Sequence, residues 1–261
     1  MKLISICPSN TELCAALQIE DLLIAVDDYS DFPTSVSALP KLGPDLSIDI
    51  DALEALQPDL VLASLSVPGM EKNIQALEER QIPHIVFNPS TIEEIIHDIL
   101  TLGKAVGIET KAKEVAASFR TEIDTYKQIA DKIEVKKNLY WEWWPNPLFT
   151  PGKNNWLTEI SMLAGGRNIF EHVELASIQV QSQDVISLNP DYILLAWVGV
   201  AEKRINPSIV VRREGWNELT AIQSNQILVM EEHLYCRPSP RLLEGLRKLA
   251  YQLHPDYYPV Y

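Results

Sequence analysis

The chain has 261 residues, enough for one large domain or two of ordinary size. Hydrophobic residues make up 46% and charged residues 22%, as is typical of soluble globular proteins, and no apolar run approaches the roughly 18 residues of a membrane span. The formal net charge of −14 argues against nucleic acid or an anionic membrane surface as the main partner. Three widely spaced cysteines argue against a disulfide framework and against a zinc cluster.

Strands and helices alternate in the first part of the chain. Ser9 with Glu12 has the spacing of a capping box and predicts a helix that runs through Leu17. Further strands and helices follow, and such alternation predicts a mostly parallel sheet covered by helices. The predicted strands are 3–7, 24–26, 60–63 and 84–87, and the predicted helices after the first are 49–55, 69–80 and 91–106.

A long helix is predicted over about 110–132. The segment contains no Gly or Pro, and apolar residues recur at helical spacing. At 1.5 Å per residue such a helix would be on the order of 33 Å long. After it, the sequence predicts strands at 138–141 and 227–230, a strand that follows Pro190-Asp191 and runs to Trp197, a helix at 156–164 ended by Gly165-Gly166, and a closing helix at 239–253.

One short sequence motif occurs twice. Ala55-Leu56-Gln57-Pro58-Asp59-Leu60-Val61 returns as Ser187-Leu188-Asn189-Pro190-Asp191-Tyr192-Ile193, and each copy predicts a helix end, a Pro-Asp turn and a buried strand. The repeat predicts an α/β fold with two similar lobes, mostly parallel sheets, one long connecting helix and a ligand cleft between the lobes. The expected boundaries are 1–106 for the N-terminal lobe, 107–134 for the connecting helix and 135–261 for the C-terminal lobe.

No strong catalytic constellation is present. The sequence lacks a Gly-x-Gly-x-x-Gly, a Walker A motif, a Gly-x-Ser-x-Gly and a His-Glu-x-x-His. The five histidines are scattered along the chain, and the paired carboxylates are typical of exposed helix faces. We therefore expect a binding protein that is not an enzyme and uses no catalytic cofactor.

Aromatic residues are concentrated at 140–144, which holds three of the six tryptophans. Strand alternation places Tyr140 and Glu142 on one face and Trp141 and Trp143 on the other. The Pro-rich segment that follows would project Trp143, Trp144 and Phe149 toward the cleft as a stacking wall for a large flat ligand. The alternative is that these rings fill the core.

Two further loops follow predicted strands, where α/β proteins bind ligands. The loop 28–32 contains Tyr29, and the loop 233–241 contains His233, Tyr235 and Arg237. His233 is a candidate axial ligand for a metal centre, although an ordinary loop histidine is the alternative. Arg237 has the chemistry to pair with a phosphate or carboxylate.

These segments carry a resemblance to a known family. Cys7-Pro8-Ser9-Asn10-Thr11-Glu12-Leu13, Asp28-Tyr29-Ser30-Asp31-Phe32-Pro33, Asn146-Pro147-Leu148-Phe149-Thr150-Pro151-Gly152 and Arg237-Pro238-Ser239-Pro240-Arg241 resemble the vitamin B12-binding proteins of ABC importers. The wider group is the helical-backbone metal receptor superfamily, which also binds iron–siderophores and haem. The resemblance covers nearly the whole chain and implies a corrinoid held between two lobes.

The resemblance also implies roles for individual residues. Tyr29 would contact the ring from the first lobe, and Trp143 and Phe149 take the places of the family's aromatic contacts in the second. Arg237 lies where the family has a ligand-contacting arginine, and His233 where it has an aspartate. Family tryptophans near Asp45, Ser64 and Ser177 are absent, and the additional rings of Trp144 and Trp197 are candidate replacements.

The same resemblance implies docking on an ABC permease with its ATPase subunits, through one acidic residue per lobe. Glu71 matches the first; the second falls on Gln183, next to Asp184. We expect a monomer that works outside the cytoplasm, although the chain as written shows no signal peptide, which would indicate the cytoplasm. Two alternatives stay open: a haem or ferric-siderophore binding protein of the same fold, and a cytoplasmic corrinoid-handling enzyme or sensor.

Overall fold

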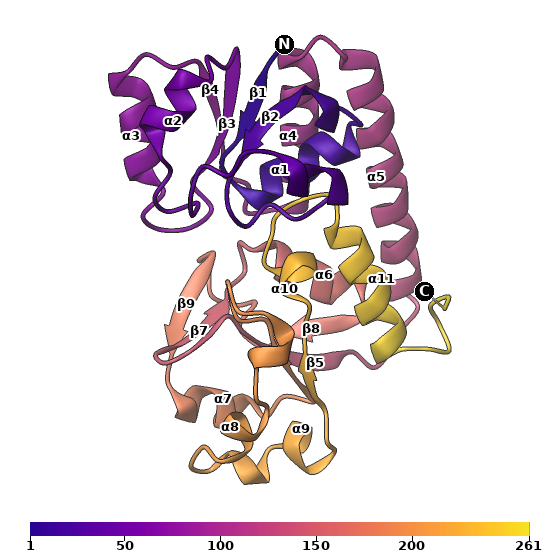
Figure 1. Ribbon diagram of the computed structural model, residues 1–261. Helices are drawn as coiled ribbons and strands as arrows, with labels where there is room; N and C mark the ends of the chain where they lie inside the picture. Colours follow the sequence, from indigo (N-terminus) through magenta and orange to yellow (C-terminus); the bar gives the residue numbers. More distant parts are fainter. Residues whose placement is uncertain (261) are drawn as a thin grey trace. The chain divides into compact units, whose positions relative to one another are not determined.

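A computed structural model describes residues 1–260 (Figure 1). The chain divides into two compact units. Unit 1 comprises Met1–Phe119 and Pro238–Pro240, and unit 2 comprises Arg120–Arg237 and Arg241–Tyr261. The chain passes from unit 1 to unit 2 inside the longest helix, α5 (Glu109–Ala130). The fold is mixed α/β with two lobes and parallel sheets, as the sequence predicts.

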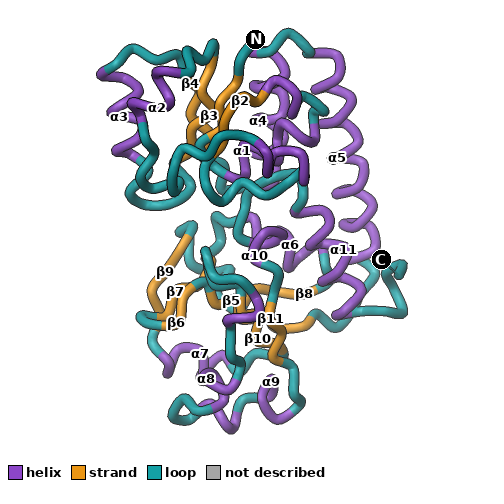
Figure 2. Tube along the Cα trace, viewed as in Figure 1, coloured by secondary structure: helices purple, strands orange, loops and turns teal. Residues whose placement is uncertain are grey.

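Unit 1 is built on a parallel sheet of order β2-β1-β3-β4, with helices α2 and α3 on one side and α4 on the other (Figures 1 and 2). Its core consists mainly of aliphatic side chains from β1 and β3 and from the helices packed on them. The elements of this unit are β1 (Leu3–Ser5), α1 (Pro8–Ala16), β2 (Leu23–Val26), α2 (Ile50–Ala55), β3 (Leu60–Ser64), α3 (Glu71–Glu79), β4 (His84–Phe87) and α4 (Ile92–Ala105), with short 3₁₀ helices η1 (Glu20–Leu22) and η2 (Thr34–Ala38).

The predicted cap of α1 is wrong. The helix begins at Pro8, with Cys7 at the N-cap position and no side-chain cap. The Ser9 hydroxyl shares a hydrogen bond of 3.2 Å with the Cys7 sulfur, and the buried Glu12 carboxylate accepts one from the Ser239 hydroxyl. A proline at the first helical position offers a preset φ and needs no partner for its nitrogen, so the helix starts two residues earlier than a Ser9 cap predicts.

Unit 2 contains a parallel sheet of order β11-β10-β5-β8, with α6, α10 and α11 on one side and α7, α8 and α9 on the other (Figures 1 and 2). Gly165, at φ +75°, ends α6 in the left-handed conformation predicted for it. The elements of the parallel sheet and its helices are β5 (Lys137–Glu142), α6 (Trp156–Leu163), β8 (Gly166–Asn168), α7 (Ser182–Leu188), β10 (Tyr192–Leu195), η3 (Glu202–Arg204), α8 (Ser208–Val211), η4 (Trp216–Glu218), α9 (Thr220–Gln223), β11 (Ile227–Val229), α10 (Glu232–Tyr235) and α11 (Leu242–Leu253).

A small antiparallel sheet in unit 2 was not predicted. It has the order β6-β7-β9 and consists of β6 (Trp144–Pro145), β7 (Leu148–Pro151) and β9 (Ser177–Val180). β6 and β7 form a hairpin in which Trp144 pairs with Phe149. This hairpin gives the Pro-rich segment after β5 a defined backbone and thereby positions its aromatic side chains.

The repeated sequence motif forms the same turn in both units. Gln57 and Asn189 both have a positive φ, +50° and +40°. Each following aspartate accepts a hydrogen bond from a backbone N–H at the start of the central strand: Asp59 from Lys2 (2.6 Å) and Asp191 from Asn138 (2.7 Å). The left-handed residue therefore ends the helix, and the aspartate aligns the next strand with its neighbour.

Candidate functional site

The candidate residues lie at the carboxyl edges of the two parallel sheets. In each sheet all strands run the same way, so the loops that follow them leave from one edge. That edge is where open α/β sheets bind ligands. In unit 1 the loop 27–33 follows β2, and in unit 2 Trp143, Trp197 and α10 follow β5, β10 and β11.

A buried aspartate organises the loop of unit 1. Asp27 accepts hydrogen bonds from the backbone N–H groups of Tyr29 (2.8 Å) and Ser30 (3.1 Å) and from the Ser30 hydroxyl (2.5 Å). Lys41 donates from its ammonium group to the carbonyls of Asp27 and Ser30. Burial raises the pKa of Asp27 to about 6, although the bonds from Ser30 and Tyr29 favour the carboxylate. The loop therefore has a fixed backbone.

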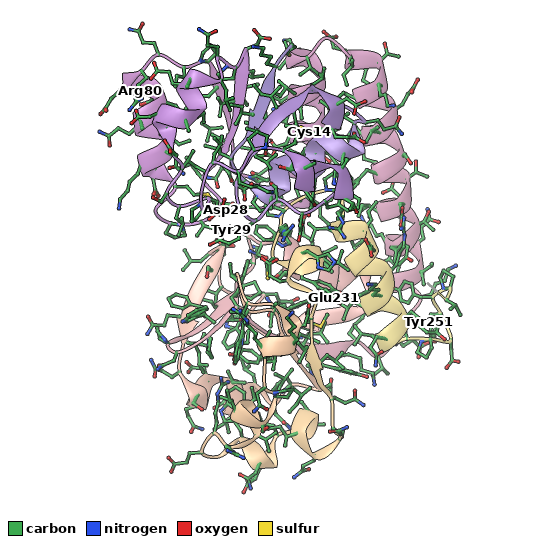
Figure 3. The ribbon with its side chains drawn as sticks, in the orientation of Figure 1. Cys14, Asp28, Tyr29, Arg80, Glu231 and Tyr251 are labelled. Carbon is green, nitrogen blue, oxygen red and sulfur yellow. The ribbon has the colours of Figure 1, made fainter. Side chains whose placement is uncertain are left out.

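Tyr29 is presented to solvent by this braced loop. Its side chain is 52% exposed, and it lies beside Asp28 at the edge of unit 1 (Figure 3). Phe32, three residues on, is also exposed. An exposed ring on a fixed backbone is suited to stacking on a flat ligand, because little conformational freedom is lost when it binds.

Trp143 is held by other aromatic residues of unit 2. Its ring meets the Trp156 ring edge to face, with centroids 5.5 Å apart. Trp156 is buried and donates from Nε1 to the Tyr235 carbonyl (2.8 Å). Trp143 Nε1 itself is buried and has no hydrogen-bond partner within residues 1–260. Packing, not the indole N–H, thus positions this ring, and no local pattern in the sequence indicated that Trp156 supports it.

Trp144 and Phe149 lie on the hairpin next to Trp143. They form a cross-strand pair, and the Trp143 N–H donates to the Phe149 carbonyl (2.9 Å). Trp144 is 44% exposed, and its indole donates to the Asn146 carbonyl (3.1 Å). The structure thus brings the three predicted stacking residues of unit 2 together on one short segment.

Two predicted ligand contacts are core residues instead. Tyr235 is 1% exposed, donates its hydroxyl to the Gly245 carbonyl (2.8 Å) and packs against Trp141. Trp197 is 7% exposed and belongs to the apolar core of unit 2. Trp197 follows β10 and Tyr235 follows β11, but neighbouring side chains enclose both rings. Both side chains pack and form hydrogen bonds within unit 2.

A buried polar network at the end of β5 was not predicted. Glu142 is fully buried and accepts hydrogen bonds from the Tyr140 hydroxyl (3.2 Å), from Trp197 Nε1 (3.1 Å) and from two guanidinium nitrogens of Arg213 (2.5 and 2.9 Å). The guanidinium also lies 4.5 Å from the centre of the Trp216 ring. Tyr140 and Glu142 therefore share one face of β5, as alternation predicts. Their pairing with Arg213 spans 71 residues of sequence and leaves no local signal.

His233 and Arg237 both have carboxylate partners in unit 2. Arg237 lies 3.2 Å from Glu232, and His233 Nδ1 lies 3.8 Å from Glu202. Arg237 is only 11% exposed as a side chain. Each side chain thus lies near an acid of the same unit, and for Arg237 this acid lowers the attraction that the guanidinium offers to an anion.

The two predicted docking carboxylates each accept a backbone hydrogen bond at the start of a helix. Glu71 accepts from the Gly69 N–H (2.7 Å) at the start of α3. Asp184 accepts from the Gln181 N–H (2.8 Å) in a reciprocal capping box that starts α7. Both bonds lie at exposed positions, so each carboxylate has lone pairs facing solvent.

Across residues 1–260, no group of three or more His, Cys, Asp or Glu side chains is arranged to hold a metal ion. Within the same described part of the chain, every helix is too short or too polar to cross a membrane.

Sequence comparison identifies the family. The profile described as "Periplasmic binding protein" matches residues 3–234. The chain belongs to this family. Its members bind solutes for transport, and the chain is accordingly a binding protein and not an enzyme.

Individual relatives cover nearly the whole chain. An "Uncharacterized ABC transporter substrate-binding lipoprotein" of Bacillus subtilis is 28% identical, over 98% of this chain and 80% of its own length. A "Vitamin B12-binding protein" of Vibrio parahaemolyticus is 27% identical, over 94% of this chain and 86% of its own. Among solved structures, a "Periplasmic Heme Binding Protein" of Pseudomonas aeruginosa has a TM-score of 0.84 at 20% identity, with 100% and 95% of the two chains covered. This last likeness shows the fold alone.

Proposed function

We propose that the chain captures a cobalamin-like corrinoid outside the cytoplasm and delivers it to an ABC permease with its ATPase subunits. The observation that carries the proposal is the presentation of rings at the carboxyl edges of both sheets: Tyr29 in unit 1, and Trp143, Trp144 and Phe149 in unit 2. The names of the Vibrio and Bacillus relatives support it. On this proposal the rings presented by each unit are candidate ligand contacts.

Affinity would come from covering the faces of a broad macrocycle. Burial of apolar area is worth roughly 25 cal/mol per Å², less the cost of association. The rings named above are large and need little ordering, because the Asp27 bonds brace the loop of Tyr29 and the hairpin braces Phe149. Arg237 and His233 would then contact the ligand's periphery, with Glu232 and Glu202 beside them.

A second candidate ligand is haem. The observation that favours it is the exposed Tyr29 side chain, since a phenolate is an iron ligand. His233 is a second candidate ligand for the metal, although its Nδ1 faces Glu202. A ferric siderophore has less support, because Arg237, after α10, and Lys248, on α11, are paired with carboxylates.

Equilibrium dialysis with cyanocobalamin and with haemin separates these candidates. We expect micromolar or tighter binding of cyanocobalamin, with quenched tryptophan emission, and no displacement by equimolar haemin. Tyr29→Ala should weaken binding about 5- to 30-fold, as the loss of one aromatic contact worth about 1–2 kcal/mol predicts. Tyr257→Ala, which removes another exposed tyrosine, is the matched control and should not change the affinity.

If the protein binds haemin but not cyanocobalamin, the proposed ligand is haem. No uptake of either compound, or equal losses in Tyr29→Ala and Tyr257→Ala, would overturn it.

We also propose that Glu71 and Asp184 dock on the permease. Each accepts a backbone N–H bond at a helix start and keeps acceptors toward solvent. Conversion of each to alanine should reduce stimulation of the transporter's ATPase without changing ligand affinity. Glu79→Ala, at the other end of α3, is the control for general charge loss.

A further inference from the structure

A row of buried hydroxyl groups in unit 1 connects the loop after β2 with α1 and β1. The Ser30 hydroxyl lies 2.5 Å from Asp27 Oδ1 and 2.7 Å from Thr11 Oγ1. Thr11 Oγ1 lies 2.8 Å from the Ser5 hydroxyl, which donates to the Cys7 carbonyl at 3.0 Å. All four side chains of the row are at most 3% exposed, so bulk solvent does not reach these contacts. The protein itself must therefore supply every proton that the row needs.

The hydroxyl groups supply one proton fewer than the row requires. Four contacts join five oxygens, from Asp27 Oδ1 to the Cys7 carbonyl, and each hydrogen bond needs one proton. The three hydroxyl groups have one proton each. The carbonyl only accepts, so the Ser5 proton is committed to it, and an ionised Asp27 would commit the Ser30 proton in the same way. Thr11 would then have one proton for two neighbours in the row, and its 3.5 Å contact with the Cys7 carbonyl adds a further acceptor.

A proton on Asp27 Oδ1 removes this shortage. Asp27 then donates to Ser30, and Ser30 donates to Thr11. Thr11 donates to Ser5, which donates to the Cys7 carbonyl. Each of the four contacts is then a hydrogen bond, and all of them point the same way, which is the arrangement in which hydrogen bonds strengthen one another.

The groups around Asp27 are compatible with a neutral carboxyl. Burial raises the pKa of Asp27 to about 6, and repulsion from Asp45 acts in the same direction. Lys41 acts in the opposite direction, but its ammonium group donates to two backbone carbonyls and not to the carboxyl oxygens. The Cys7 thiol adds no charge, since burial raises its pKa to about 11.

We propose that Asp27 of the folded chain is a neutral carboxylic acid whose proton completes the row of hydroxyl groups and thereby positions Tyr29. Asp27 Oδ2 still accepts from the N–H groups of Tyr29 and Ser30, so both oxygens of the acid hold the loop. The contact with Ser30 favours a carboxylate only where Ser30 is the donor, and the proton count reverses that direction. Only the consequence for ligand binding rests on the proposed function.

Infrared difference spectroscopy detects this proton directly. Spectra of the wild type and of Asp27→Asn are compared at pH 5.5, where an ordinary aspartate is ionised. We expect the wild type to show a carboxylic acid C=O stretching band that the variant lacks. Absence of such a band from the difference spectrum overturns the inference.

Variants of Thr11 test the proton count itself. Thr11→Val removes one proton and two contacts from the row, so that Ser5 and Ser30 can fill the other two contacts while Asp27 is ionised. The Asp27 band should fall to about half or less in Thr11→Val and should persist in Thr11→Ser, which keeps the hydroxyl. An equal band in the two variants would show that burial alone holds the proton, and would overturn the role of the row.

Binding measurements test whether the acid positions Tyr29. An asparagine amide can donate to Ser30 and accept from the two backbone N–H groups, as the neutral acid does. Asp27→Asn should therefore bind cyanocobalamin within about twofold of the wild type, whereas Asp27→Ala should bind it at least about fivefold more weakly. Equal losses in the two variants would mean that the loop requires a carboxylate, which contradicts the inference. If the wild type binds no cyanocobalamin, the proposed function fails and the infrared result still decides the protonation of Asp27.

Discussion

Units 1 and 2 share a sheet order and a turn but differ at the end of the central strand. Reading β8-β5-β10-β11 beside β2-β1-β3-β4 gives the same arrangement, and Asp59 and Asp191 make the same bond. When these aspartates are aligned through the strand registers, Ile6 in unit 1 corresponds to Glu142 in unit 2. Ile6 packs in an apolar core, whereas Glu142 forms the buried network with Arg213.

The difference shows which features the fold requires. The turn and the strand register recur in both units because the backbone hydrogen bonds depend on them. Unit 1 has an apolar core at the corresponding position, so the fold itself does not require a buried ion pair there. Glu142 directly precedes Trp143 and bonds to Trp197. The network therefore fixes the carboxyl edge of unit 2, where the candidate rings lie.

The largest expected effect comes from breaking the network on one side. Arg213→Ala leaves Glu142 buried without its cation and should lower the free energy of unfolding by about 3–5 kcal/mol. Urea unfolding measures the loss, and hydrogen exchange should localise it to β5 and β10. Arg167→Ala is the control, because its pair with Glu171 is exposed and should cost less than about 1 kcal/mol. Equal losses in the two variants would show that the buried pair has no special role.

Replacing both Glu142 and Arg213 tests whether the buried ion pair is needed for stability. Glu142→Leu with Arg213→Leu makes unit 2 resemble unit 1 and should recover most of the stability that Arg213→Ala loses, to within about 2 kcal/mol of the wild type. Trp197 should nevertheless change its emission, because its indole loses its acceptor. A double variant as unstable as the single one would mean that the network is required for the fold of unit 2.

The shared turn can be tested with matched variants. Asp191→Ala should destabilise by about 1–2 kcal/mol, because its bond to the Asn138 N–H is half-buried. Asp59→Ala should cost less, under about 1 kcal/mol, because the Asp59 side chain is 57% exposed. Thermal unfolding of both variants measures the two losses of stability. A larger loss in Asp59→Ala than in Asp191→Ala would contradict the view that the two aspartates have the same role.

The last expected effect depends on pH and concerns a buried acid of unit 1. Burial, with repulsion from Glu94, raises the pKa of Asp98 to about 7, well above its usual range. The folded chain then takes up a proton that the unfolded chain does not, so stability should rise as the pH falls from 8 to 5. Asp98→Asn should raise stability by about 1–2 kcal/mol at pH 8 and add little at pH 5.

Melting temperatures across that range test the prediction. Burial also raises the pKa of Asp27, to about 6. The melting temperature of Asp98→Asn should therefore still rise as the pH falls, but less steeply than that of the wild type. A variant whose melting temperature keeps the full pH dependence of the wild type would exclude Asp98 as its source.

Local patterns in the sequence were sufficient for the parallel sheets and most helices. The Pro-Asp repeat predicted β3 and β10, and Thr91 with Glu94 starts α4 through a capping box. The hairpin β6–β7 was missed because its strands are short and contain prolines. The start of α1 was misplaced because Pro8 competes with the Ser9 pattern.

The candidate site was predictable only in part. Strand order and loop position indicated Tyr29, Trp143 and Phe149, which the structure presents on braced segments. Burial of Tyr235 and Trp197, and the pairing of Glu142 with Arg213, depend on contacts between distant segments. Such contacts leave no periodicity or spacing in one sequence.

The most direct test is a crystal structure of the protein grown with cyanocobalamin. The account predicts a corrin ring in contact with at least one of the side chains of Tyr29, Trp143 and Phe149. A corrin bound away from all three side chains, or crystals that take up haemin but no cyanocobalamin, would contradict it.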